Sequence, residues 1–342
     1  MRIALLALSL ACASSSGARS RYGGIAGALA RGDAPKTTSI LVMRGGAVEY
    51  EQYFGEATPE TLHNTRSATK SLTALAVGIA LGRQALPGLD APAFAYLADL
   101  KPIAYDGPLK ESITLEDLLT MSSALDCDDN DGKSPGNEEN MYPLPVWTRW
   151  AVDVPVRGDY QRDATGRGPF HYCTAGTLLL GQILQRAARQ PVDQFMGEHL
   201  FRPLGIERWE FARSPAGEAM TGGGLGLRTR DLASLAELVR AGGKWGNAQI
   251  IPRDFVSAAL TVHRNAFPGQ DYGYLFWHRT YATPCGSFSG WFMGGNGGNA
   301  ILIFADLQSV VIVTRTNYST KGMHQQTTRV LEEQILPALA CR

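Results

Sequence analysis

The chain has 342 residues, 44% of them hydrophobic, which is enough to bury a substantial core. Its 32 basic and 32 acidic residues balance. The charge therefore gives no reason to expect nucleic acid or an anionic membrane surface as a partner.

The N-terminus predicts export. A single arginine follows the first methionine, and the apolar run 3–11 is too short to span a bilayer. We expect residues 1–18 to be a signal peptide, cleaved after Ala13 or, if Cys12 carries a lipid, before Cys12. No long apolar run follows, so we expect a periplasmic or secreted protein with no membrane span, an N-terminal lipid anchor remaining the alternative.

A hairpin and a buried helix are predicted next. Residues 39–44 and 48–54 are rich in β-forming side chains and are joined by two glycines, which is a hairpin signal. The run 71–82 carries no charge and is apolar on every side. Such a helix belongs in a core, and its polar start should open at a cleft.

Ser67 and Lys70 stand at that polar start, three residues apart, so they share one face of a helix. A serine hydroxyl becomes a nucleophile when a base takes its proton. A lysine amine is such a base when burial or a neighbouring cation lowers its pKa. Free N–H groups at a helix start can also hold an oxyanion. Taken alone, the pair is better explained as an ordinary helix N-cap and a surface lysine, because Ser-x-x-Lys recurs by chance in many chains.

The middle of the chain predicts helices and one polar loop. The loop, 126–141, contains Asp129, Asp131 and Glu138 and loosely resembles a calcium loop. Cys127 occupies the first ligand position, however, so we expect a solvated turn and no metal. Helices are expected over 113–119, with Thr114 as the cap, and over 174–188, 192–200 and 230–242.

The last third of the chain is rich in β-forming residues, unlike the helical middle. Strands at both ends of the chain with helices between them predict an α+β fold, in which an antiparallel sheet is flanked by helices. The late β-rich runs cover 272–278, 287–293, 299–304 and 310–316, and a final helix is expected over 324–339.

We expect a single domain over 20–342. Its sheet should use about 20–66 and 225–342, and its inserted helical part about 67–224. The helix that follows Ser67 should lie at their junction, where clefts form.

Two further segments carry chemistry. The glycine-rich run 294–299 precedes a strand and not a helix, so it is no dinucleotide site. Its glycines permit close approach to a substrate and a second oxyanion donor from the main chain. Tyr172 precedes a helix and can pass a proton if a lysine stabilises its phenolate, although in isolation a core aromatic with a bonded hydroxyl is the better explanation.

In combination these motifs become recognisable. The chain resembles the β-lactamase-related serine hydrolases, a group that includes class C β-lactamases, DD-peptidases, family VIII esterases and 6-aminohexanoate-dimer hydrolases. The resemblance covers about residue 39 to the C-terminus. It rests on Ser67-Ala68-Thr69-Lys70, Leu118-Leu119-Thr120-Met121-Ser122-Ser123, Tyr172-Cys173-Thr174-Ala175-Gly176, Gly222-Gly223-Gly224-Leu225 and the late Gly-Asn-Gly-Gly turn, in that order.

The resemblance implies a β-lactamase/transpeptidase-like fold and a serine hydrolase that cleaves small esters or amides through an acyl-enzyme. Ser67 would be the acylated nucleophile, Lys70 its base and Tyr172 the residue that protonates the leaving group. The oxyanion would be held by the N–H groups of Ser67 and Asn299. The residues of the late turn that would contact substrate are Asn296, Gly297 and Gly298. No metal and no organic cofactor is implied.

Two departures from the family pattern favour the esterase and aminohexanoate-hydrolase branch. Thr174 stands where class C β-lactamases and DD-peptidases have asparagine, and Asn296 stands at the start of their Lys-Thr-Gly. The cation that meets a β-lactam carboxylate is therefore replaced, unless Arg315 supplies it. A β-lactamase or DD-peptidase remains an alternative, as does a catalytically silent member that binds cell-wall peptide or a protein partner.

Export together with the resemblance also implies a disulfide. Cys173 adjoins Tyr172, and Cys127 ends the segment that lines the cleft in this family. We expect these two cysteines to pair, with two buried free thiols as the alternative. The pairing of Cys285 and Cys341 stays open.

Overall fold

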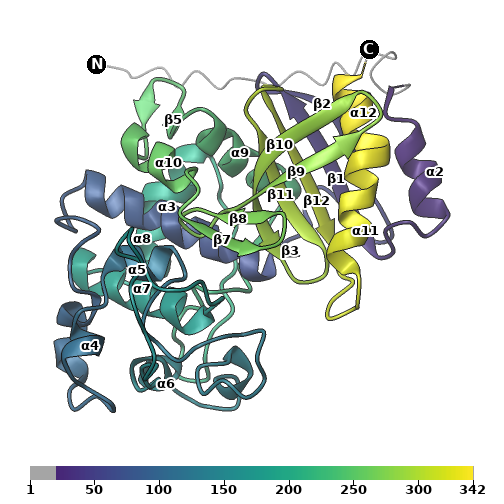
Figure 1. Cartoon of the computed structure of the whole chain (residues 1–342). Coiled ribbons are helices and arrows are strands. Elements are labelled where there is room, and N and C mark those ends of the chain that lie inside the picture. The colour runs from purple at the N-terminus through teal and green to yellow at the C-terminus, as the bar shows by residue number, and fades with distance from the viewer. Residues whose placement is uncertain (1–20, 342) are drawn as a thin grey trace, which may run out of the picture.

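The computed structural model describes residues 21–341, so the predicted signal peptide and Cys12 lie outside the described residues. An eight-stranded antiparallel sheet forms one side of the molecule, and a group of helices forms the other (Figure 1). In spatial order its strands are β2 (Ala47–Tyr53), β1 (Thr37–Arg44), β12 (Ser309–Arg315), β11 (Asn299–Phe304), β10 (Gly286–Gly295), β9 (Trp277–Thr283), β8 (Gln270–Tyr272) and β7 (Arg264–Phe267).

The sheet joins the two ends of the chain, because β1 pairs with β12 from Thr37↔Arg315 to Arg44↔Ser309. The predicted hairpin is confirmed: β1 and β2 are joined by Gly45 and Gly46, both at positive φ. The α+β prediction is confirmed as well.

Helices complete the fold. The longer ones are α2 (Gly24–Ala30), α3 (Thr69–Gly82), α7 (Thr174–Ala188), α9 (Thr229–Arg240), α10 (Arg253–Ala259) and α11 (Met323–Val330), which continues through a π-helical turn (Leu331–Ile335) into α12 (Leu336–Ala340). The shorter ones are α4 (Pro108–Glu111), α5 (Leu115–Leu119), α6 (Trp147–Val152) and α8 (Val192–Met196), and two small ladders pair β3 (His63–Asn64) with β4 (Gly226–Leu227) and β5 (Lys244–Trp245) with β6 (Ala248–Gln249). Among residues 21–341, no helix combines the length and hydropathy needed to cross a bilayer.

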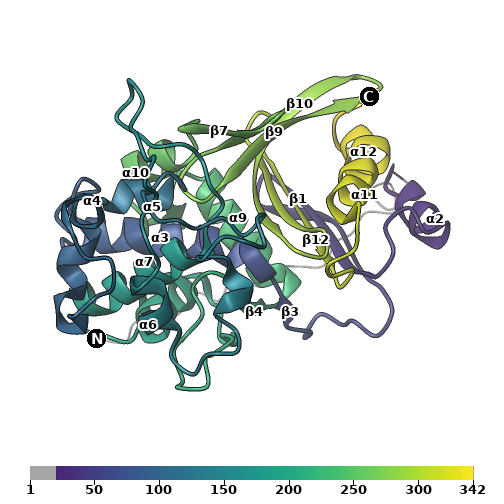
Figure 2. The ribbon, with the colours of Figure 1, turned by 60° about the horizontal axis from the view of Figure 1, so that its bottom comes forward.

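Both faces of the sheet are covered (Figure 2). Alternate side chains of β1 point to opposite faces of the sheet. Ile40 and Val42 pack under α2, α11 and α12, whereas Leu41 and Met43 join the core on the side of α3 and α9. The sheet is therefore an inner layer, and the site-bearing helix α3 lies between it and the helical half.

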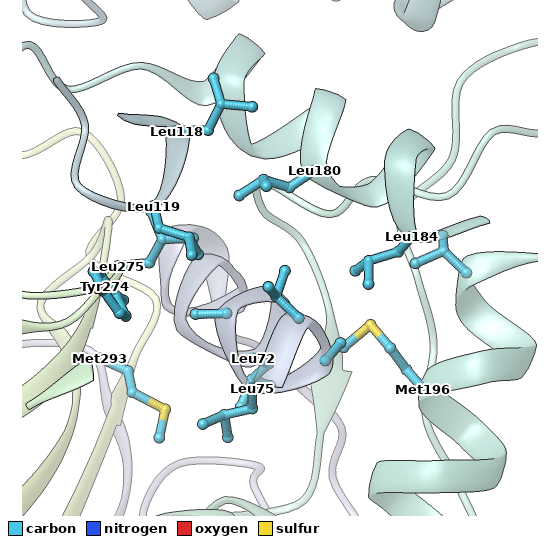
Figure 3. Close-up of a cluster of buried hydrophobic side chains, with 14 of the residues drawn as sticks. Leu72, Leu75, Leu118, Leu119, Leu180, Leu184, Met196, Tyr274, Leu275 and Met293 are labelled. Carbon is cyan, nitrogen blue, oxygen red and sulfur yellow. The ribbon is translucent and has the colours of Figure 1, made fainter. Parts of the chain in front are cut away.

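Helix α3 is buried, as its charge-free sequence predicts. Its residues from Thr69 to Ala80 are all buried. Leucines of α3, α5 and α7 meet there with Met196, Leu275 and Met293 (Figure 3). Truncating one such leucine to alanine typically costs about 2–5 kcal/mol, so this packing fixes the position of everything at the start of α3.

One predicted strand is wrong. Residues 272–278 do not form one strand, because β8 ends at Tyr272 and β9 begins at Trp277. Between them Leu275 takes a positive φ and donates its N–H to Leu119 O at 2.9 Å. The apolar side chains in between pack into the core of the helical half, so tertiary contacts override their strand propensity. Strand β7 was not predicted.

Candidate active site

Ser67 lies in a 3₁₀ turn, Arg66–Ala68, directly before α3. The turn is held by Arg66 N–H, which donates to Asn64 Oδ1 at 2.9 Å, and by Thr69 Oγ1, which donates to Arg66 O at 2.8 Å. Ala68, and not Ser67, is the N-cap of α3, and no side chain caps the helix. The N-cap interpretation of Ser67 is therefore wrong, and its hydroxyl is free to react.

Lys70 points back at this hydroxyl. Its side chain is almost fully buried, with 1% exposure. Its Nζ lies 3.3 Å from Ser67 Oγ and donates to Gly222 O at 2.6 Å. The ammonium also lies 4.9 Å from the ring centroid of Tyr172. The structure thus brings together the three residues that the sequence predicted as catalytic.

The electrostatics at Lys70 differ from the expectation. Burial alone lowers its pKa, but the neighbouring Tyr172, Glu138 and Asp129 raise it, and on balance the pKa of Lys70 is raised. Burial also raises the pKa of Tyr172, with Lys70 and a hydrogen bond to Ser67 opposing it. Each shift favours the protonated form of its own group, the ammonium of Lys70 and the phenol of Tyr172, and an increase in pH favours the free amine.

The acidic loop is not the solvated turn that its composition predicts. Asp129 N–H donates to Tyr172 O at 2.8 Å, and Asp129 Oδ2 accepts from Thr174 N–H at 2.8 Å. Glu138 Oε2 accepts from Thr174 Oγ1 at 3.1 Å. Burial raises the pKa of Asp129 to about 6. The sequence analysis did not place these two acids at the site. The only signal in the sequence was the neighbouring Cys127, whose expected bond to Cys173 brings this loop close to Tyr172.

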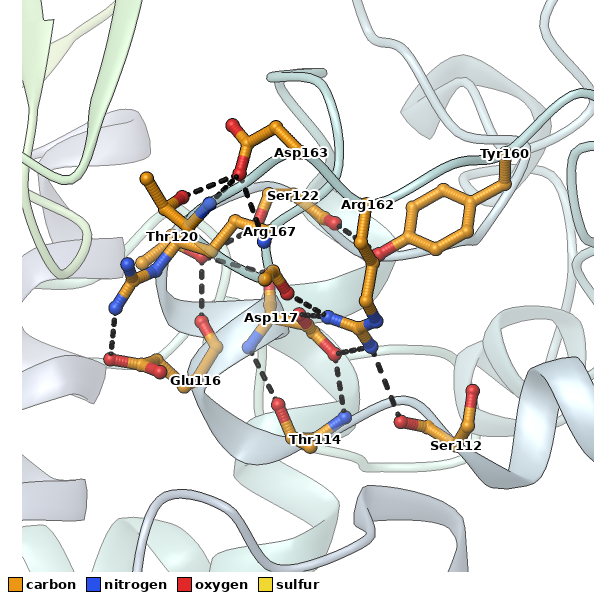
Figure 4. Close-up of polar contacts among 12 residues, drawn as sticks. Ser112, Thr114, Glu116, Asp117, Thr120, Ser122, Tyr160, Arg162, Asp163 and Arg167 are labelled. Carbon is orange, nitrogen blue, oxygen red and sulfur yellow. Dashed lines mark hydrogen bonds and ion pairs between the residues drawn. The ribbon is translucent and has the colours of Figure 1, made fainter.

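A disulfide ties this loop to the tyrosine. The sulfur atoms of Cys127 and Cys173 lie at disulfide distance, which is the expected pair. The segment before Tyr172 is also anchored on α5, where Arg162 makes two 2.7 Å contacts with the buried Asp117 carboxylate (Figure 4). Asp117 also closes a capping box with the predicted cap of α5. Cys285 and Cys341 form a second pair at disulfide distance.

A Gly-x-Ser-x-Gly sequence, the pattern found around the nucleophile of α/β-hydrolases, runs from Gly132 to Gly136 in the same loop. Its Ser134 is 6% exposed, and its Oγ is bonded to Asp128 N–H and Asp126 O. The motif lies in a loop and not in a strand-to-helix turn, so it is no nucleophile elbow.

Asn299 has a structural role in the late turn. It is 2% exposed; its Nδ2 donates to Asn296 O at 2.7 Å and Arg315 O at 3.0 Å, and its Oδ1 accepts from Arg315 N–H at 2.9 Å. Gly297 and Gly298, both at positive φ, lie beneath Tyr318 and the Arg315 guanidinium. These groups hold the turn to the end of β12.

The end of β10 faces the cavity, as does Asn299 at the start of β11. The pairing of β9 with β10 ends at Trp277↔Phe292, so Gly294 and Gly295 extend past the end of β9. Both glycines and Asn296 line the cavity that contains Ser67. A Cβ on Gly295 would lie within 3.0 Å of Thr65 O, so glycine is what lets β10 approach the Ser67 turn.

Arg315 does not supply a cation to a substrate. It is 1% exposed, and its guanidinium donates to Pro35 O, Met323 O, Thr327 Oγ1 and Gln326 Oε1. Burial lowers its pKa to about 10. This arginine holds the last strand to α11.

The cavity at Ser67 has a volume of about 380 Å³. Its walls come from the acidic loop, from the outer strands of the sheet and from α11. Arg279 reaches it from β9, where Nη1 donates to Thr328 Oγ1 at 3.1 Å. The site thus combines a nucleophile, a lysine–tyrosine pair and exposed strand backbone in a space suited to a small substrate.

A family model described as Beta-lactamase matches residues 25–335. The chain belongs to the beta-lactamase family. Within curated proteins of similar sequence, the 6-aminohexanoate-dimer hydrolase of Paenarthrobacter ureafaciens is 25% identical over 290 residues, which cover 82% of this chain and 70% of that protein. The family resemblance deduced from the motifs is confirmed.

Solved structures share the fold. EstCE1, described as a hydrolase with promiscuous acyltransferase activity, aligns with a TM-score of 0.70 and 17% identity over 92% of this chain and 98% of that one. A D-stereospecific amidohydrolase from Streptomyces sp. aligns with a TM-score of 0.67 and 16% identity over the same shares, 92% and 98%. At these identities the likeness establishes the beta-lactamase-type fold alone.

Proposed function

We propose that this chain is a serine hydrolase that cleaves ester or amide bonds through a covalent acyl-enzyme on Ser67. The observation that carries the proposal is the 3.3 Å approach of the buried Lys70 Nζ to Ser67 Oγ at the wall of a cavity. The hydrolase relatives in the same family support it.

In the acylation step, Ser67 Oγ attacks the substrate carbonyl carbon and its proton passes to the Lys70 amine, directly or through Tyr172. The carbonyl oxygen becomes an oxyanion, held by the N–H of Ser67 and by a main-chain N–H of β10. We assign that second donor to Gly295, because this residue lines the cavity and its backbone lies against the Ser67 turn.

The tetrahedral intermediate then collapses. The bond to the leaving group breaks, and Tyr172 gives that group a proton, which Lys70 replaces. Water hydrolyses the acyl-enzyme by the same path in reverse: the pair takes a proton from water and returns one to Ser67 Oγ. The acid product leaves, and no cofactor enters the balance.

We also propose that the protein is exported to the periplasm or secreted. Two cysteine pairs at disulfide distance support an oxidising compartment, as does the sequence of residues 1–18. A lipid anchor on Cys12 is the alternative form of this proposal, in which the exported protein stays attached to the membrane.

Esters should be better substrates than β-lactams. Asn296 is neutral and its Oδ1 accepts from Ser319 N–H at 2.7 Å, while Thr174 is bonded to Glu138. A lost hydrogen bond to a charged group typically costs about 1.5–3 kcal/mol, or about 10- to 150-fold in kcat/KM. An ester has no carboxylate to place and loses little.

The test is kcat/KM for p-nitrophenyl butyrate and for nitrocefin on one preparation. We expect the ester value to be higher by at least tenfold. The Arg279→Gln variant shows whether this cavity-lining cation assists nitrocefin. A wild-type nitrocefin value equal to or above that of the ester would contradict the assignment.

A further inference from the structure

Three aromatic rings form a continuous stack along the cavity wall. The Trp277 ring lies between Phe267, at 6.0 Å between centroids and 15° between planes, and Phe292, at 6.4 Å and 20°. These values fall in the range of offset stacking. All three rings line the cavity that contains Ser67. We call Phe267, Trp277 and Phe292 the ring stack.

A β-bulge directs Phe267 into the stack. In the β7–β8 hairpin Asn265 pairs with Asp271, but Phe267 pairs with Gln270, so the register shifts between them. Without the shift, Phe267 would share the face of Asn265. The bulge moves it to the face of Gln270, which also lines the cavity. Bulges often redirect a side chain next to an active site in this way.

The outermost ring is open. Phe267 is 44% exposed, although its neighbour Trp277 is largely enclosed. Phe170 meets Phe267 in a T-shaped pair, with planes at 80° and centroids at 5.9 Å. The Phe267 ring is thus half exposed at the cavity, where it is accessible to a bound group.

The ring stack adjoins the catalytic residues. The Tyr172 ring lies 5.5 Å from the Trp277 ring, and the Lys70 ammonium lies 4.9 Å from the centroid of the same Tyr172 ring. A substrate whose carbonyl is placed at Ser67 therefore has the ring stack within a few bonds of its reacting atoms.

We propose that the ring stack is a recognition surface for a flat aromatic group attached close to the scissile carbonyl, so that the substrates are aryl-bearing esters or amides. This inference rests on the proposed hydrolase function. An aromatic group gains stacking energy beyond its buried area, and an aliphatic group of the same size does not. Phe267 is thus a specificity-determining residue. The aromatic group can belong to the acyl part or to the leaving group, and the experiment separates the two.

The test compares matched substrates that differ only in flatness. For the acyl side these are p-nitrophenyl phenylacetate and p-nitrophenyl cyclohexylacetate; for the leaving group they are benzyl acetate and cyclohexylmethyl acetate. Each kcat/KM is divided by the rate of hydroxide-catalysed hydrolysis, which removes intrinsic reactivity. We expect the wild type to prefer the flat member of one pair by about 2- to 12-fold.

Two variants of the exposed ring test its role. Phe267→Leu keeps an apolar side chain and removes the ring, and Phe267→Ala removes both; in each variant the ratio of the two corrected kcat/KM values within the preferred pair should fall toward one. Tyr105→Ala is the control, because Tyr105 is 64% exposed in the helical half and lines a different hollow. Its preference should match the wild type.

Equal corrected rates in both pairs, or a preference that survives both Phe267 variants, would overturn the ring-stack proposal and leave the hydrolase intact. Failure to hydrolyse any of the esters would instead overturn the proposed function, and this inference with it.

Discussion

Gly295→Ala is the substitution that tests the oxyanion assignment most sharply. The new Cβ would lie within 3.0 Å of the Thr65 carbonyl oxygen and at 3.3 Å from the Cβ atoms of Arg66 and Asn299. The close neighbour is backbone of the turn that precedes Ser67, so no side chain can rotate away. The end of β10 and the Ser67 turn must therefore move apart.

The size of the effect follows from that displacement. A misplacement of about 1 Å at a reacting centre can cost about 100-fold, and loss of one oxyanion donor costs about 100- to 1000-fold in kcat. We expect kcat for p-nitrophenyl butyrate to fall by about 100-fold or more. The KM should change little, since the N–H acts mainly on the transition state.

Gly294→Ala is the matched control. It lies on the same strand one residue away, but its Cβ would meet the Phe292 and Trp277 side chains at 3.2 and 3.3 Å, and these can shift. We expect less than about a tenfold loss of kcat. Thermal melting of both variants checks that each is folded. A folded Gly295→Ala enzyme with wild-type kcat would refute the assignment of the oxyanion donor.

The remaining predictions concern the proton path and the disulfide beside it. Lys70→Ala and Tyr172→Phe should each lower kcat by about 100- to 10,000-fold, and the double variant little further, because they share one proton path; multiplicative losses would argue against it. Because the pKa of Lys70 is raised and its amine is the reactive form, kcat/KM should increase with pH above neutrality. Asp129→Asn removes one cause of that raised pKa, so the profile should move to lower pH; a shift to higher pH would contradict the role of this carboxylate. A Cys127–Cys173 disulfide closes 46 residues and should contribute about 4 kcal/mol to the free energy of unfolding, so peptide mapping that found both cysteines alkylated without reduction would exclude it.

Local sequence patterns predicted much of the fold. Helix 174–188 and strand 299–304 begin and end where the sequence indicated, and the charge-free run after Ser67 is buried. Each of these elements is a continuous run whose apolar composition and flanking residues can be seen locally, so a local pattern is sufficient to indicate it. The strand prediction was wrong for 273–276. The apolar residues of this segment pack into the core of the helical half, and no local pattern in the sequence shows that contact.

The candidate site divides in the same way. Ser67, Lys70 and Tyr172 were predicted from motifs and lie together in the structure. Asp129 and Glu138 were not, because their polar loop is drawn to the site by contacts with residues far along the chain. Their effect on the pKa of Lys70 is likewise a property of the folded chain alone.

Covalent labelling of Ser67 tests the central claim most directly. The wild-type protein, incubated with a fluorophosphonate and measured by intact mass spectrometry, should gain one adduct, and peptide mapping should place it on Ser67. Ser67→Ala should gain none and lose ester hydrolysis, with an unchanged melting temperature, since the hydroxyl caps no helix. A Ser67→Ala protein that is still labelled, or that still hydrolyses p-nitrophenyl butyrate at the wild-type rate, would contradict the account.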